Sequence, residues 1–407
     1  DIFNLTLNYD FGFATLTSSS SQVDIETYDA STSILVSASE DPDLNSGLLV
    51  FSVTRDLSGF AQEIRLDSNS NNITTVDWTI GAFYTDIDDL TSGEGTGFYL
   101  EGVELASPVP YEISKVFEST ALFANLRYHF NDQINLTLGT RYFEEDQTQQ
   151  FGGLQEASFD HLSSKLSLSY TVTDQASVYF SVSEGFRSGG MNPFSTVNYE
   201  PETVTTYEFG AKALLFEGRL NTEGAIFYSQ YSNYQARDID QQTSSSVTVN
   251  PGDVDLQGIE LSTQLSLSEQ LSVGFSGHYT DSEFTKVGVI PIVQVGDPVD
   301  NTPKYSYSVN AKFDFDWSSD VAGFARFDYN RQDGTVVTNR TISNQPAESD
   351  PIGFLNAQLG AQWESFTIRL FGKNLTNEDG VTAPVLGVNV FSQNRPRTWG
   401  VDFTYKF

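Results

Sequence analysis

The chain has no cysteine, one methionine, three histidines and few basic residues. The lack of cysteine excludes a disulfide framework, a thiolate zinc site and a cysteine nucleophile. Only 21 Lys and Arg stand against 54 Asp and Glu, a formal net charge of −33. Neutralising phosphates requires clustered cations, so this balance argues against a nucleic-acid partner. We expect no metal site and no cofactor.

Long apolar runs are also missing. No segment reaches the roughly 18 consecutive apolar residues of a membrane helix. An acidic chain without such runs could be disordered, but 13% of its residues are aromatic, which argues for folded structure. At 407 residues the chain is longer than the roughly 250–300 residues at which a single soluble hydrophobic core stops growing. It therefore holds several domains, or it forms one architecture whose size is not limited in this way.

The dominant signal in the sequence is a period of two. In segment 355–363, Leu355, Ala357, Leu359 and Trp363 alternate with polar or small residues. Successive side chains of a strand point to opposite faces, so this pattern predicts a strand with one apolar and one polar face. Helical spacing is nowhere sustained.

About seventeen such segments are present. Many span 10 to 15 residues, against about 5–6 for a globular strand and about 9–11 for a tilted transmembrane strand. The lengths therefore favour an all-β, antiparallel transmembrane barrel over stacked soluble sandwiches. The expected strands are 2–9, 11–25, 59–68, 75–86, 116–130, 133–145, 160–172, 174–186, 202–216, 219–231, 253–267, 270–282, 304–316, 320–331, 353–363, 366–375 and 396–407.

The connections between these strands alternate between short and long. Short turns at one rim and long loops at the other are typical of an outer-membrane barrel, with the turns periplasmic and the loops extracellular. Aromatic residues near strand ends fit the membrane interfaces of such a barrel. The long loops are expected at 26–58, 87–115, 146–159, 187–201, 232–252, 283–303, 332–352 and 376–395.

The C-terminal strand ends on phenylalanine. Its alternating apolar residues are predicted to share one face and resemble the C-terminal signal of bacterial outer-membrane proteins, which the barrel-assembly machinery reads. These residues are Trp399, Val401, Phe403, Tyr405 and Phe407.

Several segments along nearly the whole chain resemble TonB-dependent outer-membrane receptors, and their motif set is most similar to the siderophore-type branch. Each segment is weak alone, but their order and spacing are specific. They are 62–66 with 78–84, 184–192 (EGFRSGGMN), 201–212 (PE with YEFGAK), 250–261 (NPGD with GIEL), 371–377 (FGKNLTN) and 395–400 (RPRTWG).

The resemblance implies a transport receptor and not an enzyme. It implies a 22-stranded barrel in the bacterial outer membrane with an N-terminal plug, energised by the TonB–ExbB–ExbD complex and most often importing a ferric siderophore. The barrel-assembly machinery and lipopolysaccharide are further expected partners. A passive porin-like channel and TonB-dependent uptake of an oligosaccharide or corrinoid stay open as alternatives.

The direction of each predicted strand indicates whether these strands can close a whole barrel. If Phe407 lies in the periplasm, strand 2–9 descends from the extracellular rim. Seventeen strands cannot close an even-numbered barrel with both ends periplasmic. We therefore expect residues 1–407 to form a partial barrel, with the plug and about five strands outside this chain.

Two groups of residues are candidate functional sites. Charged residues inside strands are expected to face the lumen or plug, because a charge on the lipid face costs about 2–4 kcal/mol at the bilayer midplane. An internally paired lumen wall explains them equally well. These residues are Arg127, Arg141, Lys165, Glu208, Glu260, Arg326 and Arg369.

The second group lies on the expected outer loops. Arg187 could contact an anionic ligand, although its motif could instead shape the loop through glycines at positive φ. Loop tyrosines could stack on a ligand or pack the loops together. These are Tyr99, Tyr111, Tyr199 and Tyr234.

Overall fold

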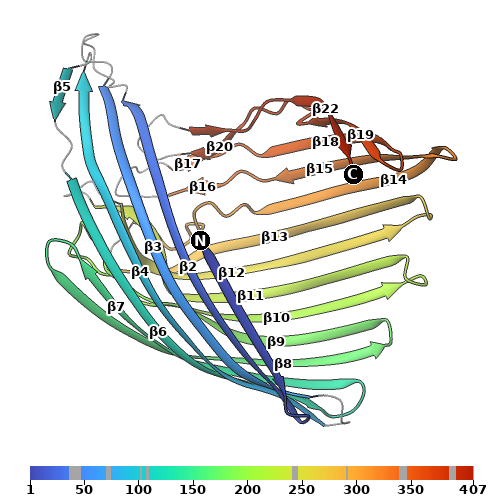
Figure 1. Cartoon of the computed structure of the whole chain (residues 1–407), viewed down its shortest axis with the longest axis horizontal. Coiled ribbons are helices and arrows are strands. Elements are labelled where there is room, and N and C mark those ends of the chain that lie inside the picture. The colour runs from blue at the N-terminus through green and yellow to red at the C-terminus, as the bar shows by residue number, and fades with distance from the viewer. Residues whose placement is uncertain are drawn as a thin grey trace.

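In the computed structural model the chain folds into one antiparallel sheet whose strands follow each other in sequence order. The structure describes residues 1–35, 47–69, 75–100, 103–106, 110–240, 246–289, 292–338, 346–384 and 391–406. The strands form a continuous curved wall (Figure 1). Within the described ranges no helix is long and apolar enough to cross a membrane, a result that has no bearing on strands.

The elements are β1 (Ile2–Asp10), β2 (Ala14–Leu35), β3 (Gly47–Ser68), β4 (Val76–Leu100), β5 (Val103–Ala106), β6 (Pro110–His129), β7 (Ile134–Gln150), β8 (Leu154–Thr173), β9 (Ala176–Arg187), β10 (Glu202–Leu215), β11 (Leu220–Ile239), β12 (Ser246–Ser266), β13 (Leu271–Val287), β14 (Tyr305–Ser318), β15 (Val321–Gln332), β16 (Val336–Val337), β17 (Ala347–Glu348), β18 (Ile352–Gln362), β19 (Phe366–Lys373), β20 (Val381–Pro384), β21 (Phe391–Gln393) and β22 (Thr398–Tyr405).

The main sheet has 18 strands among the described residues, and 17 remain when the four-residue β5 is set aside. Each of the seventeen corresponds to a strand that the alternation predicts. Strands β16 with β17 and β20 with β21 form two small separate ladders. In the described part of the chain β1 pairs with β2 alone and β22 with β19 alone, so both ends of the sheet present an edge.

The predicted loops 26–58 and 87–115 are wrong in large part. Strand β2 continues to Leu35 and pairs residue by residue with β3 from Gly47, while β4 continues to Leu100. Likewise β7 and β8 leave only residues 151–153 between them. The added residues of β2, β4 and β7 show no sustained apolar alternation, so this pattern cannot reveal them, yet their backbones still pair strand to strand.

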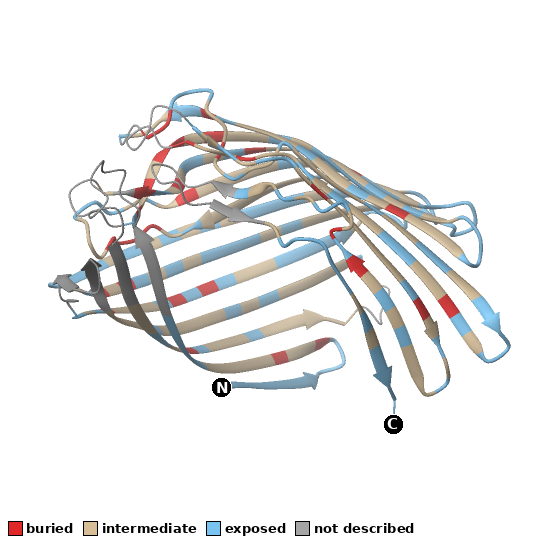
Figure 2. Cartoon of the chain, turned by 90° about the horizontal axis from the view of Figure 1, so that it is seen from above, coloured by how far each residue is buried: buried red, intermediate tan, exposed pale blue. Residues whose placement is uncertain are grey.

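One face of the sheet is apolar and exposed. On β8, Leu162, Leu166 and Leu168 are 56, 42 and 46% exposed and alternate with Ser163, Lys165 and Ser167. The register continues this face sideways, because Leu168 lies opposite Leu136 on β7 and Phe180 on β9. Exposed, half-exposed and buried residues alternate along the wall in Figure 2. Such a broad apolar surface fits hydrocarbon and not water.

Aromatic rings collect at the short-turn end of this surface. Trp363 stacks on Phe366 at 4.4 Å between ring centroids, and Tyr128 meets Phe130 edge-on at 4.7 Å. Of the aromatic residues near strand ends, only one ring in each of the adjacent pairs 142–143 and 227–228 lies on this apolar face. Tyr142 is on the apolar face, so Phe143 beside it points to the opposite, inner face, and Phe227 does so for the same reason.

Arginine placed at position 166 or 167 tests which face meets lipid. Leu166→Arg puts a charge on the apolar face and should lower the free energy of unfolding by about 2–4 kcal/mol, depending on its depth. Ser167→Arg puts the same charge on the polar face and should change it by less than about 1 kcal/mol. Urea unfolding in lipid vesicles measures both. Equal destabilisation by the two variants contradicts this assignment.

Candidate functional site: the inner wall and the tied loops

All seven predicted lumen residues lie on the polar face of the sheet. Arg127, for example, follows the outward Leu126 on β6, and Arg369 lies between Ile368 and Leu370 on β19. The register places Arg141, Lys165, Glu208, Glu260 and Arg326 on the same face. Their contact with a plug or ligand stays a prediction.

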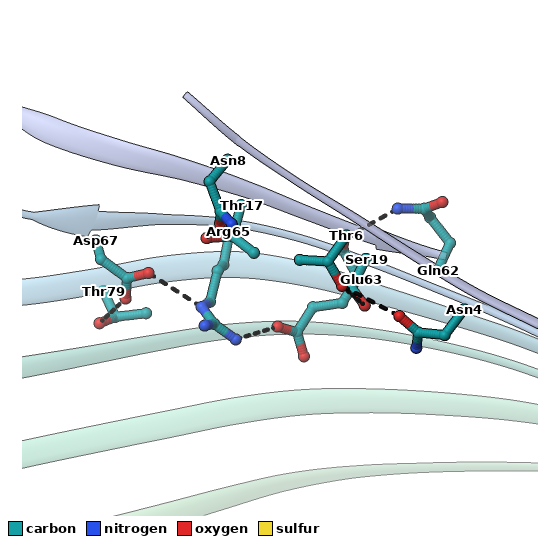
Figure 3. Close-up of polar contacts among 10 residues, drawn as sticks. All are labelled: Asn4, Thr6, Asn8, Thr17, Ser19, Gln62, Glu63, Arg65, Asp67 and Thr79. Atoms are coloured by element: carbon teal, nitrogen blue, oxygen red, sulfur yellow. Dashed lines mark hydrogen bonds and ion pairs between the residues drawn. The ribbon is translucent and has the colours of Figure 1, made fainter. Parts of the chain in front are cut away.

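Many charges on this inner wall are paired within it. The Arg65 guanidinium donates to Glu63 at 2.7 Å and to Asp67 at 3.0 Å, and Thr79 donates to the same Asp67 (Figure 3). Arg369 lies 3.4 Å from Asp402. Hydroxyls and amides continue the pattern on β1 and β2, where the Thr17 hydroxyl donates to Asn8 at 2.8 Å. A wall of this kind is hydrated and internally neutralised over much of its area.

The structure brings Glu208 and Glu260 together on one cavity of about 790 Å³. Its lining also includes Tyr179, Lys212 and His278. The Tyr179 hydroxyl donates to Glu208 at 2.7 Å, and Lys212 pairs with Glu223 at 3.4 Å. The other five predicted lumen residues do not line this cavity. It is therefore an acidic, hydrogen-bonding recess in a wall that carries cations elsewhere.

Arg187 is engaged by a buried carboxylate. Its guanidinium donates at 2.8 Å to Glu202, whose side chain is only 6% exposed. The second oxygen of Glu202 accepts the backbone N–H of Gln235 at 2.5 Å. Breaking one partner of such an arrangement strands a buried charge. The geometry therefore favours a structural role for Arg187 in joining β9, β10 and β11.

The loop 188–201 is tied to the strand tips by side-chain amides. Asn192 donates to the carbonyls of Val197 and Thr248, at 2.7 and 2.8 Å, and accepts the N–H of Thr248 at 2.9 Å. Gln235 donates to the carbonyls of Ser188 and Glu200. In the sequence Asn192 is visible only as part of the motif at 184–192, and no pattern marks Gln235.

The glycines of this loop are required by close packing. Gly189 and Gly190 are absent from the positive-φ residues, so the expectation that the motif works through positive φ is wrong. A side chain at Gly190 would collide with the ring of Tyr199, and one at Gly189 with the Tyr199 carbonyl. The backbones of Gly190 and Tyr199 exchange two hydrogen bonds of 3.0 Å. The pair of glycines thus lets the loop close on itself.

The predicted loop tyrosines pack within the protein. Tyr111 meets Phe194 edge-on at 5.7 Å, and Tyr234 meets Phe284 at 5.9 Å. Burial raises the pKa of Tyr199 above its ordinary value. Strand β4 contains Tyr99, but its side chain lies outside the described residues, as does Phe407 of the predicted assembly signal. The contacts of Tyr111, Tyr199 and Tyr234 fit the packing hypothesis better than the stacking one.

An apolar cluster closes the neighbouring loop onto β12 and β13. Val249, Val254, Phe284 and Ile292 are each 0–3% exposed, and Tyr231 and Tyr234 pack against them. Asp300 extends the same loop, since its carboxylate accepts the Thr338 N–H at 2.7 Å and the Asn301 N–H donates to the Val336 carbonyl. The long-loop end is therefore held together at several points.

These chain-wide features agree with comparisons to known proteins. A sequence model of the family described as TonB dependent receptor-like, beta-barrel, matches residues 1–375. The chain belongs to the TonB-dependent receptor family. Members of this family are outer-membrane transport receptors of bacteria, which makes the exposed apolar face the lipid face.

Individual relatives of this TonB-dependent receptor are distant. The pesticin receptor of Yersinia enterocolitica is 24% identical over 290 residues, covering 66% of this chain and 40% of the relative. A probable TonB-dependent siderophore receptor, PiuA, of Acinetobacter baumannii is 24% identical over 51% of this chain and 30% of its own length. The chain therefore spans less than half of these curated relatives.

Solved structures show the same fold. The ferric yersiniabactin uptake receptor FyuA of Yersinia pestis superposes with a TM-score of 0.81 at 19% identity, over 100% of this chain and 61% of that one. The siderophore receptor PiuA of Acinetobacter baumannii gives 0.77 at 18% identity, over 99% of this chain and 63% of that one. The fold of the receptor wall is thus shared along the whole chain.

Removing the Asn192 amide tests the loop ties. Asn192→Ala deletes three hydrogen bonds of about 1 kcal/mol each and should speed amide hydrogen exchange in residues 188–201 by at least about 30-fold. Asn198→Ala, on an exposed position of the same loop, is the matched control and should leave exchange unchanged. Unchanged exchange in both variants would show that the loop is held elsewhere.

Asp300 gives the loops a pH dependence. Burial, together with the nearby Asp297, raises its pKa from 3.8 to about 6. The carboxyl of Asp300 thus holds its proton more tightly in the folded loop than in the unfolded chain. The stability that protonated Asp300 contributes to the loop is therefore lost as pH rises from about 4 through 6. The Thr338 amide resonance in ¹⁵N-threonine-labelled protein should titrate near pH 6, and Asp300→Asn should abolish this titration. A Thr338 resonance that titrates identically in the variant refutes the assignment.

Proposed function

We propose that the protein is an outer-membrane receptor that takes up a ferric siderophore with energy supplied through TonB. The observation that carries the proposal is the agreement of the wall, over its full length, with receptors whose names state ferric yersiniabactin or siderophore uptake. The polar, partly self-paired inner face supports passage of a polar ligand. The tied long-loop end supports a preformed mouth on the extracellular side.

Several parts of this proposal concern components beyond the sheet. The single pairings of β1 and β22 support a larger barrel in the whole protein, completed by further strands and filled by a plug that TonB pulls. Lumen charges such as Arg127 and Arg326 would then meet the plug or the ligand. Arg187 and the loop tyrosines would act by shaping the mouth. The proposal assigns no catalytic role to any residue.

Two further partners follow from the surfaces. On β22, Trp399, Val401 and Phe403 are 75, 69 and 64% exposed on one face. This face supports recognition of the final strand by the barrel-assembly machinery. Asp86 on β4 pairs in register with Glu118 on β6, which pairs with Asp146 on β7, and this acidic row supports contact with lipopolysaccharide through shared divalent cations.

Growth on single iron sources tests the proposed function. A deletion strain should fail to grow under iron limitation on at least one ferric siderophore that supports the parent, and the receptor on a plasmid should restore growth only in a tonB⁺ background. Loss of growth on all iron sources alike, or rescue without TonB, contradicts the proposal. TonB-independent entry of small sugars would instead support the passive channel.

A further inference from the structure

We propose that the lipid face of β2 and β3 is a docking surface for a second copy of this chain in the membrane. The surface, which we call the polar patch, consists of Ser18, Ser20 and Gln22 on β2 and Gln62 on β3. These four neutral, hydrogen-bonding side chains interrupt an apolar face. The proposal concerns assembly and does not depend on which ligand is transported.

The register places the polar patch on the lipid face and not on the inner wall. Ser20 lies opposite Leu5 of β1, and Ser18 lies opposite Ile64 of β3. Leu5 and Ile64 are 59 and 49% exposed and belong to the apolar face. The neighbouring Thr17 points the other way, because its hydroxyl bonds within the inner wall. Successive strand residues alternate between faces, so Ser18 and Ser20 point toward lipid.

The depth of the polar patch makes its polarity unfavourable in a lone barrel. Strand β2 begins at Ala14 beside a short turn, and a tilted strand crosses the bilayer in about 9–11 residues. Ser18 and Ser20 therefore lie near the middle of the hydrocarbon layer. At the corresponding outward positions β4 carries Ile80 and Ala82. Polar groups that lack hydrogen-bond partners are costly in such surroundings.

Hydrogen bonds inside the polar patch meet only part of this demand. The Ser20 hydroxyl donates to Gln62, and the Gln62 amide donates to the Ser18 hydroxyl at 3.1 Å. The Gln22 amide donates to Ser58 at 3.3 Å. Within the described residues, however, the Ser18 hydroxyl hydrogen has no acceptor and Oε1 of Gln22 has no donor. Lipid chains supply neither, so a protein surface is the remaining partner.

A second copy of the polar patch is complementary to the first. Hydroxyls and amides both donate and accept hydrogen bonds, and the patch carries no charge that two copies would set against each other. All copies of a barrel enter the membrane in one direction. The two-fold axis of a dimer therefore runs along the membrane normal and brings equal depths together. Ser20 of one copy then meets Ser20 of the other.

Apolar side chains border the polar patch on both sides. Leu7 on β1 and Phe60 on β3 are 60 and 40% exposed and lie on the same face. Association inside a membrane relies on close packing and on hydrogen bonds, because lipid is as apolar as the protein surface. In the dimer the polar centre supplies the hydrogen bonds and the apolar border supplies the packing.

Disulfide trapping of the whole receptor in isolated outer membranes tests the docking surface. Residues 1–407 contain no cysteine, and the unmodified receptor serves as the blank. After mild oxidation, Ser20→Cys should yield at least tenfold more disulfide-linked dimer on a non-reducing gel than Leu166→Cys. Position 166 is the matched control, because it faces lipid on β8 at a similar distance from a short turn.

Apolar replacement tests whether hydrogen bonds drive the contact. Adding Ser18→Leu and Gln62→Leu to the Ser20→Cys receptor removes hydrogen-bonding groups and should lower the yield of dimer at least fivefold. Leucine suits the lipid face, so this variant should still fold, and heat-modified gel mobility checks that it does.

The opposite results would each overturn the proposal. Equal yields at positions 20 and 166 would indicate chance collision, and the absence of a dimer at position 20 would show that two copies do not meet there. A disulfide between position 20 and a protein of different mass would assign the surface to another partner. An unchanged yield in the leucine variant would show that the polar groups do not drive the contact.

Discussion

The structure depends on one constraint, which is that a backbone inside hydrocarbon must find all of its hydrogen-bond partners in neighbouring strands. Sequential antiparallel pairing meets this requirement for the strands that lie between β1 and β22 in the sheet. Because each strand then has two faces, the sequence must be apolar toward lipid and polar toward the lumen, residue by residue. Among the described residues the apolar cluster around Val249 and Phe284 therefore lies at the long-loop ends of β12 and β13, and not at the centre of the sheet.

The same division of faces explains where function can reside. The lipid face carries leucine and aromatic side chains, which contact hydrocarbon and do not select a polar ligand. The inner face carries pairs such as Arg65 with Glu63, and an acidic recess around Glu208. At the long-loop end, amides such as that of Asn192 hold the loop 188–201 against the strand tips through contacts within the chain itself.

Sequence alone predicts the strands well and the loops poorly. All seventeen strand segments are confirmed because apolar alternation is a local property that lipid exposure enforces. The extensions of β2 and β4 were missed, since their sequences carry no sustained apolar alternation. The alternation of side chains along each strand predicts which face a lumen residue occupies. It does not predict which residue the side chain contacts. Arg187 finds Glu202 fifteen residues away, and Gly190 is needed for the ring of Tyr199, contacts that only three-dimensional packing determines.

The absence of native cysteine makes the central claim directly measurable. Single cysteines placed from 162 to 170 on β8 can carry a nitroxide whose collisions with oxygen report lipid and whose collisions with a water-soluble nickel chelate report the lumen. The account predicts oxygen maxima at 162, 164, 166, 168 and 170 and nickel maxima at 163, 165, 167 and 169, a period of two in opposite phase. Equal accessibility to both reagents along the segment, or a period near 3.6, would contradict a membrane wall with one lipid face and one polar face.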